Sequence, residues 1–189
     1  MKIALIGTHG VGKTTLCYDL AARLKRRDVE IELVREVARR CPLPINRETS
    51  LAAQSWILHT QAAWELEAEH RNAVVLCDRS VLDNYCYLLA AAGPQPCWEP
   101  FVQAWLQTYT LLIKVPLWTP PRWDGVRDTD LNFQRHIDEL LENQLEQRLV
   151  TPLRLDPTAR ERWGEVVMAH VERLIRPIPS LFPEEEAGP

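Results

Sequence analysis

The 189 residues of this chain are enough for one globular domain and too few for two sizeable ones. Hydrophobic residues make up 46% and charged residues 25% of the composition, which excludes collagen-like and fully disordered chains. The net charge of -4 disfavours nucleic acid and anionic lipid as partners. No apolar run approaches the roughly 20 residues of a membrane span, and the four apolar residues before Gly7 are too few for a secretion signal, so we expect a cytoplasmic protein.

The chain opens with a strand, a glycine-rich turn and a helix. Residues 3–6 form a short apolar run of the kind found in buried strands. Three of the seven glycines follow within six residues, and leucines then recur at helical spacing through residues 14–27. A backbone with this concentration of glycine indicates a loop that bends sharply or approaches a ligand closely.

The loop matches the phosphate-binding pattern G-x-x-x-x-G-K-[ST] at residues 7–14. In this pattern the backbone N–H groups and the helix N-terminus bind phosphates, Lys13 contacts the β- and γ-phosphates, and the Thr14 hydroxyl binds Mg²⁺. The alternative is a structural turn whose glycines only permit tight packing. His9 is expected to line the loop rather than to react. The predicted nucleotide-binding residues are Gly7, Thr8, His9, Gly10, Val11, Gly12, Lys13, Thr14 and Thr15.

Two acidic residues follow the next predicted strands, at residues 31–34 and 73–77, which flank a long helix over 49–71. Asp78 is predicted to complete the Mg²⁺ site with Thr14, the alternative being a helix cap for the segment that begins near Ser80. Glu36 is a candidate general base for an acceptor hydroxyl, the alternative being a partner for Arg35 or Arg39. The choice between Asp78 and Glu36 as the base stays open.

The residue after Asp78 separates classes of nucleotide-using protein. ATPase motors of the AAA type place a glutamate there to activate water, whereas this chain has Arg79. Small GTPases place a glycine three residues beyond the aspartate, where this chain has Val81, and the sequence contains no N-K-x-D or T-K-x-D stretch to recognise guanine. Arg79 is better suited to bind a second anion or to position an acceptor than to activate water, because its planar guanidinium stays charged.

The rest of the chain continues the alternation. Helices are predicted at 82–92 and 98–109, a strand at 111–115, a helix from 130 to about 145, a strand at 152–156 and a helix at 159–175. Strands that alternate with helices predict an α/β fold, a parallel sheet with helices on both faces and ligands at the carboxyl ends of the strands. We expect one domain over 1–175 and a separate proline- and glutamate-rich tail over 176–189.

The segment over about 117–135 is predicted to be a small lid. It carries Arg122 and Arg127, and an arginine placed on a migrating phosphoryl group can be worth about 10³–10⁵ in rate. The alternative is a surface loop that these arginines merely keep soluble. Trp118 and Trp123 in the same loop are candidates to stack on a flat base or pyridine ring.

Several of these motifs together resemble a known family. The phosphate loop, Arg35-Glu36, the stretch over 77–85 and the Asp-Gly-Val-Arg element at 124–127 are similar to the P-loop kinase domain of the NadR type, a ribosylnicotinamide kinase-like and AAA_28-like NTPase. The Asp-Arg-Ser element at 78–80 also resembles deoxynucleoside kinases, and Arg35-Glu36 resembles thymidylate kinases. The resemblance implies a three-layer P-loop fold with strand order 2-3-1-4-5, and ATP with Mg²⁺ as the phosphate donor.

The sequence therefore predicts an ATP- and Mg²⁺-dependent kinase that phosphorylates a hydroxyl of a small nucleoside-like acceptor. Its expected catalytic residues are Lys13, Asp78, Glu36, Arg79, Arg127 and Arg122. One alternative is a nucleotide-binding switch that hydrolyses ATP or GTP slowly. Another is a kinase of polynucleotide 5′ ends, which the acidic net charge disfavours. GTP as the donor and a homo-oligomer are both compatible with the sequence.

Overall fold

The computed structural model describes residues 1–45, 48–120 and 130–175. The strands are β1 (Lys2–Ile6), β2 (Ile31–Val34), β3 (Val74–Asp78), β4 (Leu111–Lys114) and β5 (Leu153–Arg154). The helices are α1 (Lys13–Lys25), α2 (Leu51–Arg71), α3 (Val81–Ala92), α4 (Glu99–Leu106), α5 (Leu131–Gln147) and α6 (Trp163–Ile175). Two short 3₁₀ turns, η1 (Val37–Arg40) and η3 (Arg160–Arg162), precede α2 and α6.

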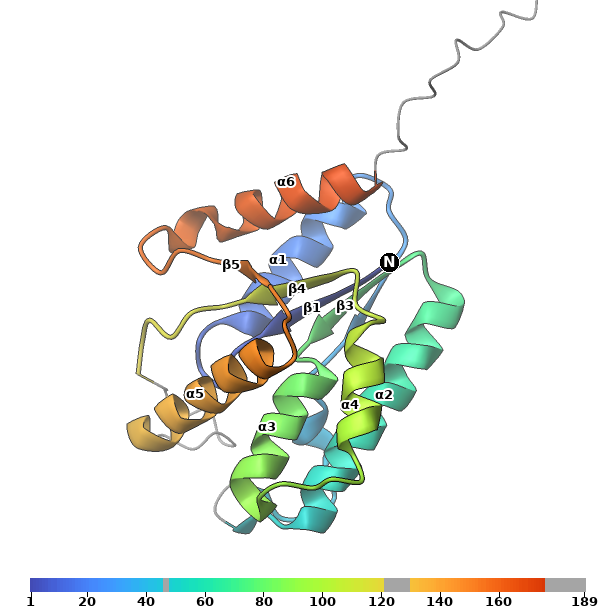
Figure 1. The fold of residues 1–189 in the computed structure, drawn as a ribbon. Coiled ribbons are helices and arrows are strands. Elements are labelled where there is room, and N and C mark those ends of the chain that lie inside the picture. The colour runs from blue at the N-terminus through green and yellow to red at the C-terminus, as the bar shows by residue number, and fades with distance from the viewer. Residues whose placement is uncertain (46–47, 121–129, 176–189) are drawn as a thin grey trace, which may run out of the picture.

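The five strands form one parallel sheet in the order β2-β3-β1-β4-β5, as the family resemblance implies (Figure 1). In the register of the sheet, Leu5 on β1 lies beside Asp78 on β3, and Val34 on β2 lies beside Cys77. The carboxyl ends of β1, β2 and β3 therefore meet at one edge. This edge is where the sequence places the phosphate loop, Glu36 and Asp78.

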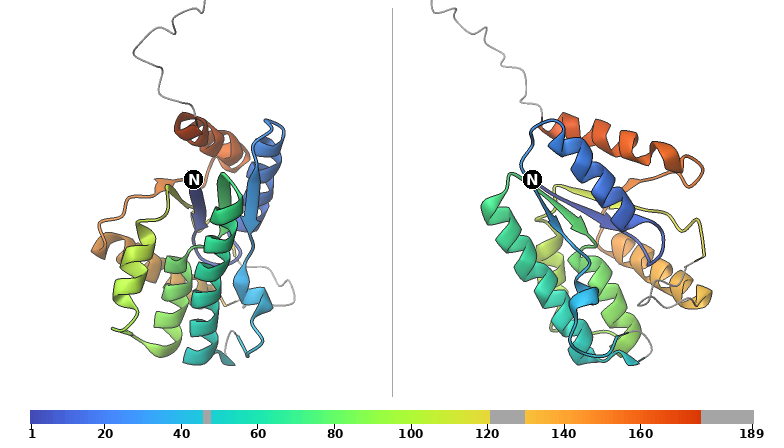
Figure 2. Two further views of the ribbon diagram at one scale, coloured as in Figure 1. Left: turned by 90° about the vertical axis from the view of Figure 1, so that its right-hand side faces the viewer. Right: turned by 180° about the vertical axis from the view of Figure 1, so that it is seen from behind.

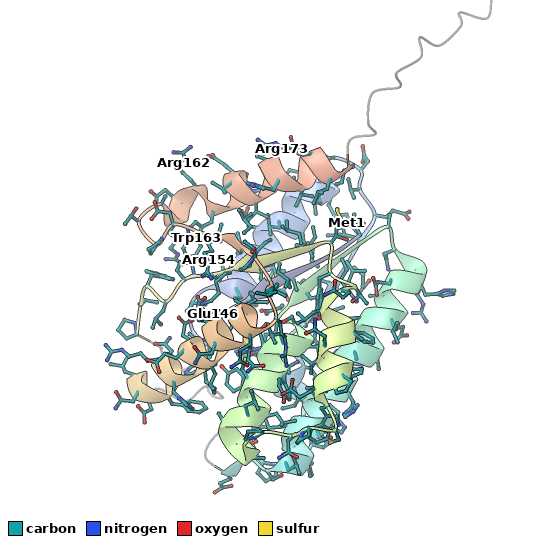
Figure 3. The ribbon with its side chains drawn as sticks, viewed as in Figure 1. Met1, Glu146, Arg154, Arg162, Trp163 and Arg173 are labelled. Atoms are coloured by element: carbon teal, nitrogen blue, oxygen red, sulfur yellow. The ribbon has the colours of Figure 1, made fainter. Side chains whose placement is uncertain are left out.

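Helices cover both faces of the sheet and give three layers (Figure 2). On one face, α1 and α6 pack through apolar side chains that include Leu20, Leu24 and Val167. Trp163, labelled in Figure 3 at the start of α6, is buried in this layer and donates its indole N–H to the Asp156 carbonyl. On the other face, α2, α3, α4 and α5 bury a second apolar cluster against β1 and β3. Strands that are buried on both faces explain the short, continuous apolar runs in the sequence.

Helix caps account for two of the predicted boundaries, at Asp130 and Gly93. Asp130 caps α5, and its carboxylate accepts hydrogen bonds from the N–H groups of Asn132 and Phe133. Gly93 follows α3 with a φ of +70°, a conformation that favours glycine. The N-cap of α3 is Ser80, which forms a reciprocal capping box with Asp83. The helix-cap interpretation of Asp78 is therefore wrong.

Some predicted elements are too long, and η1 is missing from the prediction. The helix expected over 14–27 ends at Lys25, before Asp28 adopts a φ of +58°. The strand expected over 152–156 contains only Leu153 and Arg154, which pair with Ile113 and Lys114. The helix expected over 98–109 ends at Leu106, and the closing helix begins at Trp163 after η3. Local sequence patterns locate these elements but do not show where tertiary pairing stops.

Within the described ranges, no helix has both the length and the apolar character needed to cross a bilayer. Most of the predicted lid, with Arg122, Trp123 and Arg127, and the whole of the 176–189 tail lie outside the described residues. The predicted division between a domain and a tail therefore stays a prediction.

Candidate nucleotide-binding and acceptor site

The loop between β1 and α1 depends on its glycines. Gly7, Gly10 and Gly12 have φ values of +144°, +79° and +101°, a region that residues other than glycine rarely adopt. A Cβ atom on Gly7 would lie 2.7 Å from the carbonyl oxygen of Val115, so this position has no room for a side chain either. Gly12 is the N-cap of α1, and no side chain among the described residues caps this helix end. Its first N–H groups are available to bind an anion.

Lys13 is buried beneath this loop. Its Nζ donates hydrogen bonds to the carbonyl oxygens of Gly7 (2.7 Å) and Thr8 (2.5 Å). Burial, followed by the charge of Arg79, lowers the pKa of Lys13 to about 8. The Lys13 ammonium is still mostly protonated at neutral pH. The loop carbonyls are neutral acceptors, whereas a bound polyphosphate would give the ammonium a negatively charged partner. Thr15, by contrast, is exposed on α1.

Thr14 and Asp78 meet at the carboxyl ends of the central strands. The Thr14 hydroxyl donates to Oδ2 of Asp78 over 2.5 Å, although the residues are 64 positions apart. Burial raises the pKa of Asp78 above its usual range, which means that its charge is poorly compensated. The described residues contain no group of three or more acidic, histidine or cysteine ligands that would bind a metal alone. One hydroxyl and one carboxylate fit Mg²⁺, which takes few protein ligands and completes its shell with water and phosphate oxygens.

Glu36 is held by arginines on both sides. Its Oε1 accepts hydrogen bonds from Nε (3.0 Å) and Nη2 (2.9 Å) of Arg79, and its Oε2 accepts one from Nε of Arg39 (2.8 Å). Burial alone would raise the pKa of Glu36, but the positive charges of Arg79 and Lys13 outweigh it and hold the pKa well below its usual range. Glu36 is therefore a weaker proton acceptor than Asp78 in this arrangement. The partnership with Arg39 that the sequence offered as an alternative is present, together with the Arg79 ion pair.

Arg79 is buried in an unusual backbone conformation. Its φ is +90°, and non-glycine residues in such conformations cost about 1–3 kcal/mol and cluster at functional sites. The guanidinium lies over the ring of Tyr87, with 4.8 Å from Cζ to the ring centroid. The Arg79 side chain is buried and interacts with the Tyr87 hydroxyl as well as with Glu36. A fixed arginine beside Glu36 is suited to position that carboxylate and to place positive charge near an anionic ligand.

A cavity of about 440 Å³ opens beside the Thr14–Asp78 pair. Its walls come from α1, β2, η1 and the end of β3, and its volume lies in the range of small-molecule sites. The lining residues are Thr14, Cys17, Tyr18, Leu33, Arg35, Glu36, Arg39, Arg40 and Asp78. The cavity therefore connects the expected metal-binding pair with the arginine-held carboxylate.

Side chains from other elements hold the outer turn of the phosphate loop. Nδ1 of His9 lies 3.0 Å from the hydroxyl of Tyr87 on α3, and Gln134 on α5 donates to the His9 carbonyl (2.8 Å). The Trp118 indole N–H donates to the carbonyl of Val11 (2.8 Å). These contacts agree with a loop-lining role for His9 and place Trp118 against the loop.

Asp83 is a site residue that the sequence patterns did not predict. Its Oδ1 accepts a hydrogen bond from the Gly7 N–H (2.8 Å), while Oδ2 accepts from the N–H and hydroxyl of Ser80. It thereby ties the first residue of the phosphate loop to the start of α3. The Ser-x-x-Asp spacing of the capping box was visible in the sequence, but the contact with Gly7 was not.

A family model described as "AAA domain" matches residues 2–162. Among solved structures, deoxyadenosine kinase from M. mycoides, with the products dCMP and dCDP bound, matches with a TM-score of 0.63 and 16% sequence identity, covering 92% of this chain and 100% of that one. No curated protein matches in sequence.

The structural match shows a shared fold, and it agrees with the sheet order and phosphate loop described above. The family match extends from β1 to η3 and so contains the phosphate loop, Glu36, Asp78 and Arg79. The chain thus belongs to the AAA domain family and has a P-loop kinase-like fold.

Proposed function

We propose that the protein is an ATP- and Mg²⁺-dependent phosphotransferase that phosphorylates a hydroxyl of a small nucleoside-like acceptor, such as a nucleoside or ribosylnicotinamide. The observation that carries the proposal is the single cavity shared by Thr14, Asp78 and Glu36. A donor site and an acceptor site must adjoin for direct transfer, since the reacting oxygens have to approach within about 3–3.5 Å.

Each polar residue has a role in this scheme. Lys13 and the N–H groups of the phosphate loop bind the triphosphate of the donor. Thr14 and Asp78 would hold Mg²⁺, which neutralises negative charge on the phosphates when it is bound. Arg79, paired with Glu36, contributes its positive charge near the transferred group or the acceptor.

Of the two candidate bases, we propose Asp78, which would then hold Mg²⁺ through a water molecule and keep a carboxylate oxygen for the proton of the acceptor hydroxyl. Burial raises its pKa, whereas Arg79 and Lys13 hold the pKa of Glu36 low. Glu36 then serves to orient Arg79, with which it shares two hydrogen bonds. Arg122 and Arg127 stay candidates for stabilising the transferred phosphoryl group, outside the described residues.

Two further findings support transfer rather than hydrolysis. Arg79 occupies the position after Asp78, where a motor of the AAA type would need a water-activating glutamate. One solved structure with a similar fold is a deoxyadenosine kinase bound to nucleotide products. A nucleoside-like acceptor is therefore the first class to test.

The test is ADP release from Mg²⁺-ATP, measured alone and with nucleosides, ribosylnicotinamide and 5′-hydroxyl oligonucleotides. We expect strong stimulation by one small acceptor. Slow release that is indifferent to every acceptor would overturn the proposal in favour of a nucleotide switch, and stimulation only by oligonucleotides would replace it with a polynucleotide kinase. Parallel reactions with GTP identify the preferred donor.

A further inference from the structure

A buried polar cluster lies between α2, α4 and the start of β1. At its centre is Glu65, whose side chain has no exposed surface. Oε1 of Glu65 accepts hydrogen bonds from Gln61 (2.9 Å) and the Tyr109 hydroxyl (2.7 Å). Oε2 accepts from the Trp105 indole (2.7 Å) and lies 3.2 Å from Nζ of Lys2. Both carboxylate oxygens are thus fully occupied.

Two members of this cluster also hold the backbone of the turn after β3. Nε2 of Gln61 donates to the carbonyl oxygen of Arg79 over 3.3 Å. The N–H of Val81 donates to the hydroxyl oxygen of Tyr109 over 2.9 Å. The carbonyl of Arg79 and the amide of Val81 are therefore both connected to Glu65 through one intervening side chain.

The directions of these bonds allow little variation. Both amide hydrogens of Gln61 have acceptors, one on Glu65 and one on Arg79. The Tyr109 hydroxyl gives its only hydrogen to Glu65 and accepts from Val81. Glu65 thereby fixes the orientation of both groups that touch the turn. An apolar cluster of equal volume would fill the space but would give the turn no directional contacts.

The turn has a conformation that needs such support. Arg79 has a φ of +90°, and its own N–H donates to the Leu5 carbonyl (3.2 Å) on the neighbouring strand. Strained residues persist only where their surroundings over-determine the backbone. Here the surroundings hold Arg79 from β1 on one side and from α2 on the other.

We infer that Gln61, Glu65 and Tyr109 are positioning residues that hold the Arg79 backbone so that its guanidinium meets Glu36 at the acceptor site. They do not line the cavity beside Asp78. Their effect on the reaction passes through Arg79, so the inference rests on the proposed function for its catalytic consequence. The conformational claim can be tested without any acceptor.

The test uses two variants and one matched control. Gln61→Met keeps the side-chain length and removes the bond to the Arg79 carbonyl, and Tyr109→Phe removes the hydroxyl that accepts from Val81. Tyr85→Phe is the control, because the Tyr85 hydroxyl also donates to a carboxylate, that of Glu99, and this pair shares no described side-chain hydrogen bond with the backbone of residues 79–81. Circular dichroism and thermal melting establish that each variant folds, and if Tyr109→Phe does not, Gln61→Met carries the test.

The first readout is the ¹⁵N–¹H NMR signal of the Arg79 Nε–H, assigned by its loss in Arg79→Lys. This group donates to Glu36 in the wild-type protein, so its signal reports the position of the guanidinium. We expect the signal to shift or broaden in Gln61→Met and Tyr109→Phe and to stay unchanged in Tyr85→Phe. Folded Gln61→Met and Tyr109→Phe proteins with the wild-type signal would overturn the inference.

The second readout is kinetic and uses the acceptor that the stimulation assay identifies. We expect the two variants to lower kcat by about tenfold or more, with the KM for ATP within twofold of wild type, because a misplaced group slows transfer without weakening donor binding. Unchanged kcat in both folded variants would remove the catalytic role. If no acceptor is phosphorylated by the wild type but the NMR result holds, the proposed function fails and the positioning of Arg79 stands.

Discussion

The phosphate side and the acceptor side of the site are built in opposite ways. The phosphate side consists of consecutive residues 7–14, and most of its expected contacts come from the backbone and one lysine. The acceptor side joins Glu36, Arg79 and Gln61 from three separate parts of the chain. A local motif specifies the first, whereas only tertiary packing assembles the second.

The two sides also differ in how their charges are satisfied. Burial lowers the pKa of Lys13 on the phosphate side to about 8 and raises that of Asp78, which contacts this side through Thr14, so the charged form of each group is destabilised. On the acceptor side, two arginines stabilise the charge of Glu36 and its pKa is lowered. The phosphate side is thus prepared for charged ligands, while the acceptor side is already organised by its own ion pairs.

The largest expected effect comes from removing the charge on the phosphate side. Lys13→Ala should lower the rate of ADP formation by about 10²–10³-fold or more, because a preorganised cation at the phosphates is lost. It should also abolish the thermal shift produced by Mg²⁺-ATP. Steady-state kinetics and thermal melting measure both effects.

Lys25→Ala is the matched control, since Lys25 is exposed at the other end of α1. It should leave both rate and thermal shift unchanged. Normal turnover in a folded Lys13→Ala protein would refute the assignment of the phosphate site.

On the acceptor side, Arg79→Lys tests whether a positive charge alone at this position supports phosphoryl transfer. Lysine keeps the charge but cannot reproduce the two hydrogen bonds that Arg79 gives to Oε1 of Glu36. We expect kcat to fall by about 10²-fold, with a much smaller change in the affinity for ATP. Calorimetric titration with Mg²⁺-ATP beside the kinetic assay separates the two quantities, and an equal loss of both would place Arg79 on the phosphate side instead.

The close approach of Gly7 to the Val115 carbonyl predicts an effect of substitution on stability. Gly7→Ala adds a Cβ atom 2.7 Å from the Val115 carbonyl, whereas Gly93→Ala adds one with nothing within 4 Å, and both positions have a positive φ. The free energy of unfolding should therefore fall by about 2 kcal/mol more in Gly7→Ala. Denaturant unfolding of the two variants gives this difference, and equal losses would show that the close approach to Val115 has no energetic consequence.

The smallest expected effects are those of Glu36 and Asp78 on the stability of the protein and its dependence on pH. Because the folded pKa of Glu36 is lowered, its ionisation stabilises the protein above the unfolded pKa of about 4.3, and this stabilisation is lost as the pH falls below that value. Glu36→Gln should flatten the decline in stability on acidification. The raised pKa of Asp78 has the opposite sign, so its ionisation at neutral pH destabilises the protein.

Asp78→Asn should therefore raise the Tm at pH 7 without Mg²⁺, by about 2 °C, while weakening Mg²⁺-dependent turnover. Thermal melts of Glu36→Gln and Asp78→Asn at several pH values, without added metal, measure the effect of each carboxylate on the Tm. A lower Tm for Asp78→Asn would show that the Asp78 charge is better compensated than its burial implies.

The sequence allowed most of the fold to be predicted. The runs at 3–6 and 73–77 are continuous and apolar because helices cover both faces of the sheet at these central strands, and the phosphate loop has a fixed residue spacing. The sequence could not show that η1 follows β2, or that Gln61 contacts Arg79. Those features depend on contacts between residues far apart in the chain, such as the 43 positions between Glu36 and Arg79.

The most direct test of the whole account is the fate of the transferred phosphate. Mg²⁺-ATP labelled in its γ-phosphate is incubated with the protein and each small acceptor, and the label is followed by mass spectrometry. We predict that the label moves to a hydroxyl of one nucleoside-like acceptor and that little is released as inorganic phosphate. Label found only in inorganic phosphate, at a rate that no acceptor changes, would contradict a phosphotransferase.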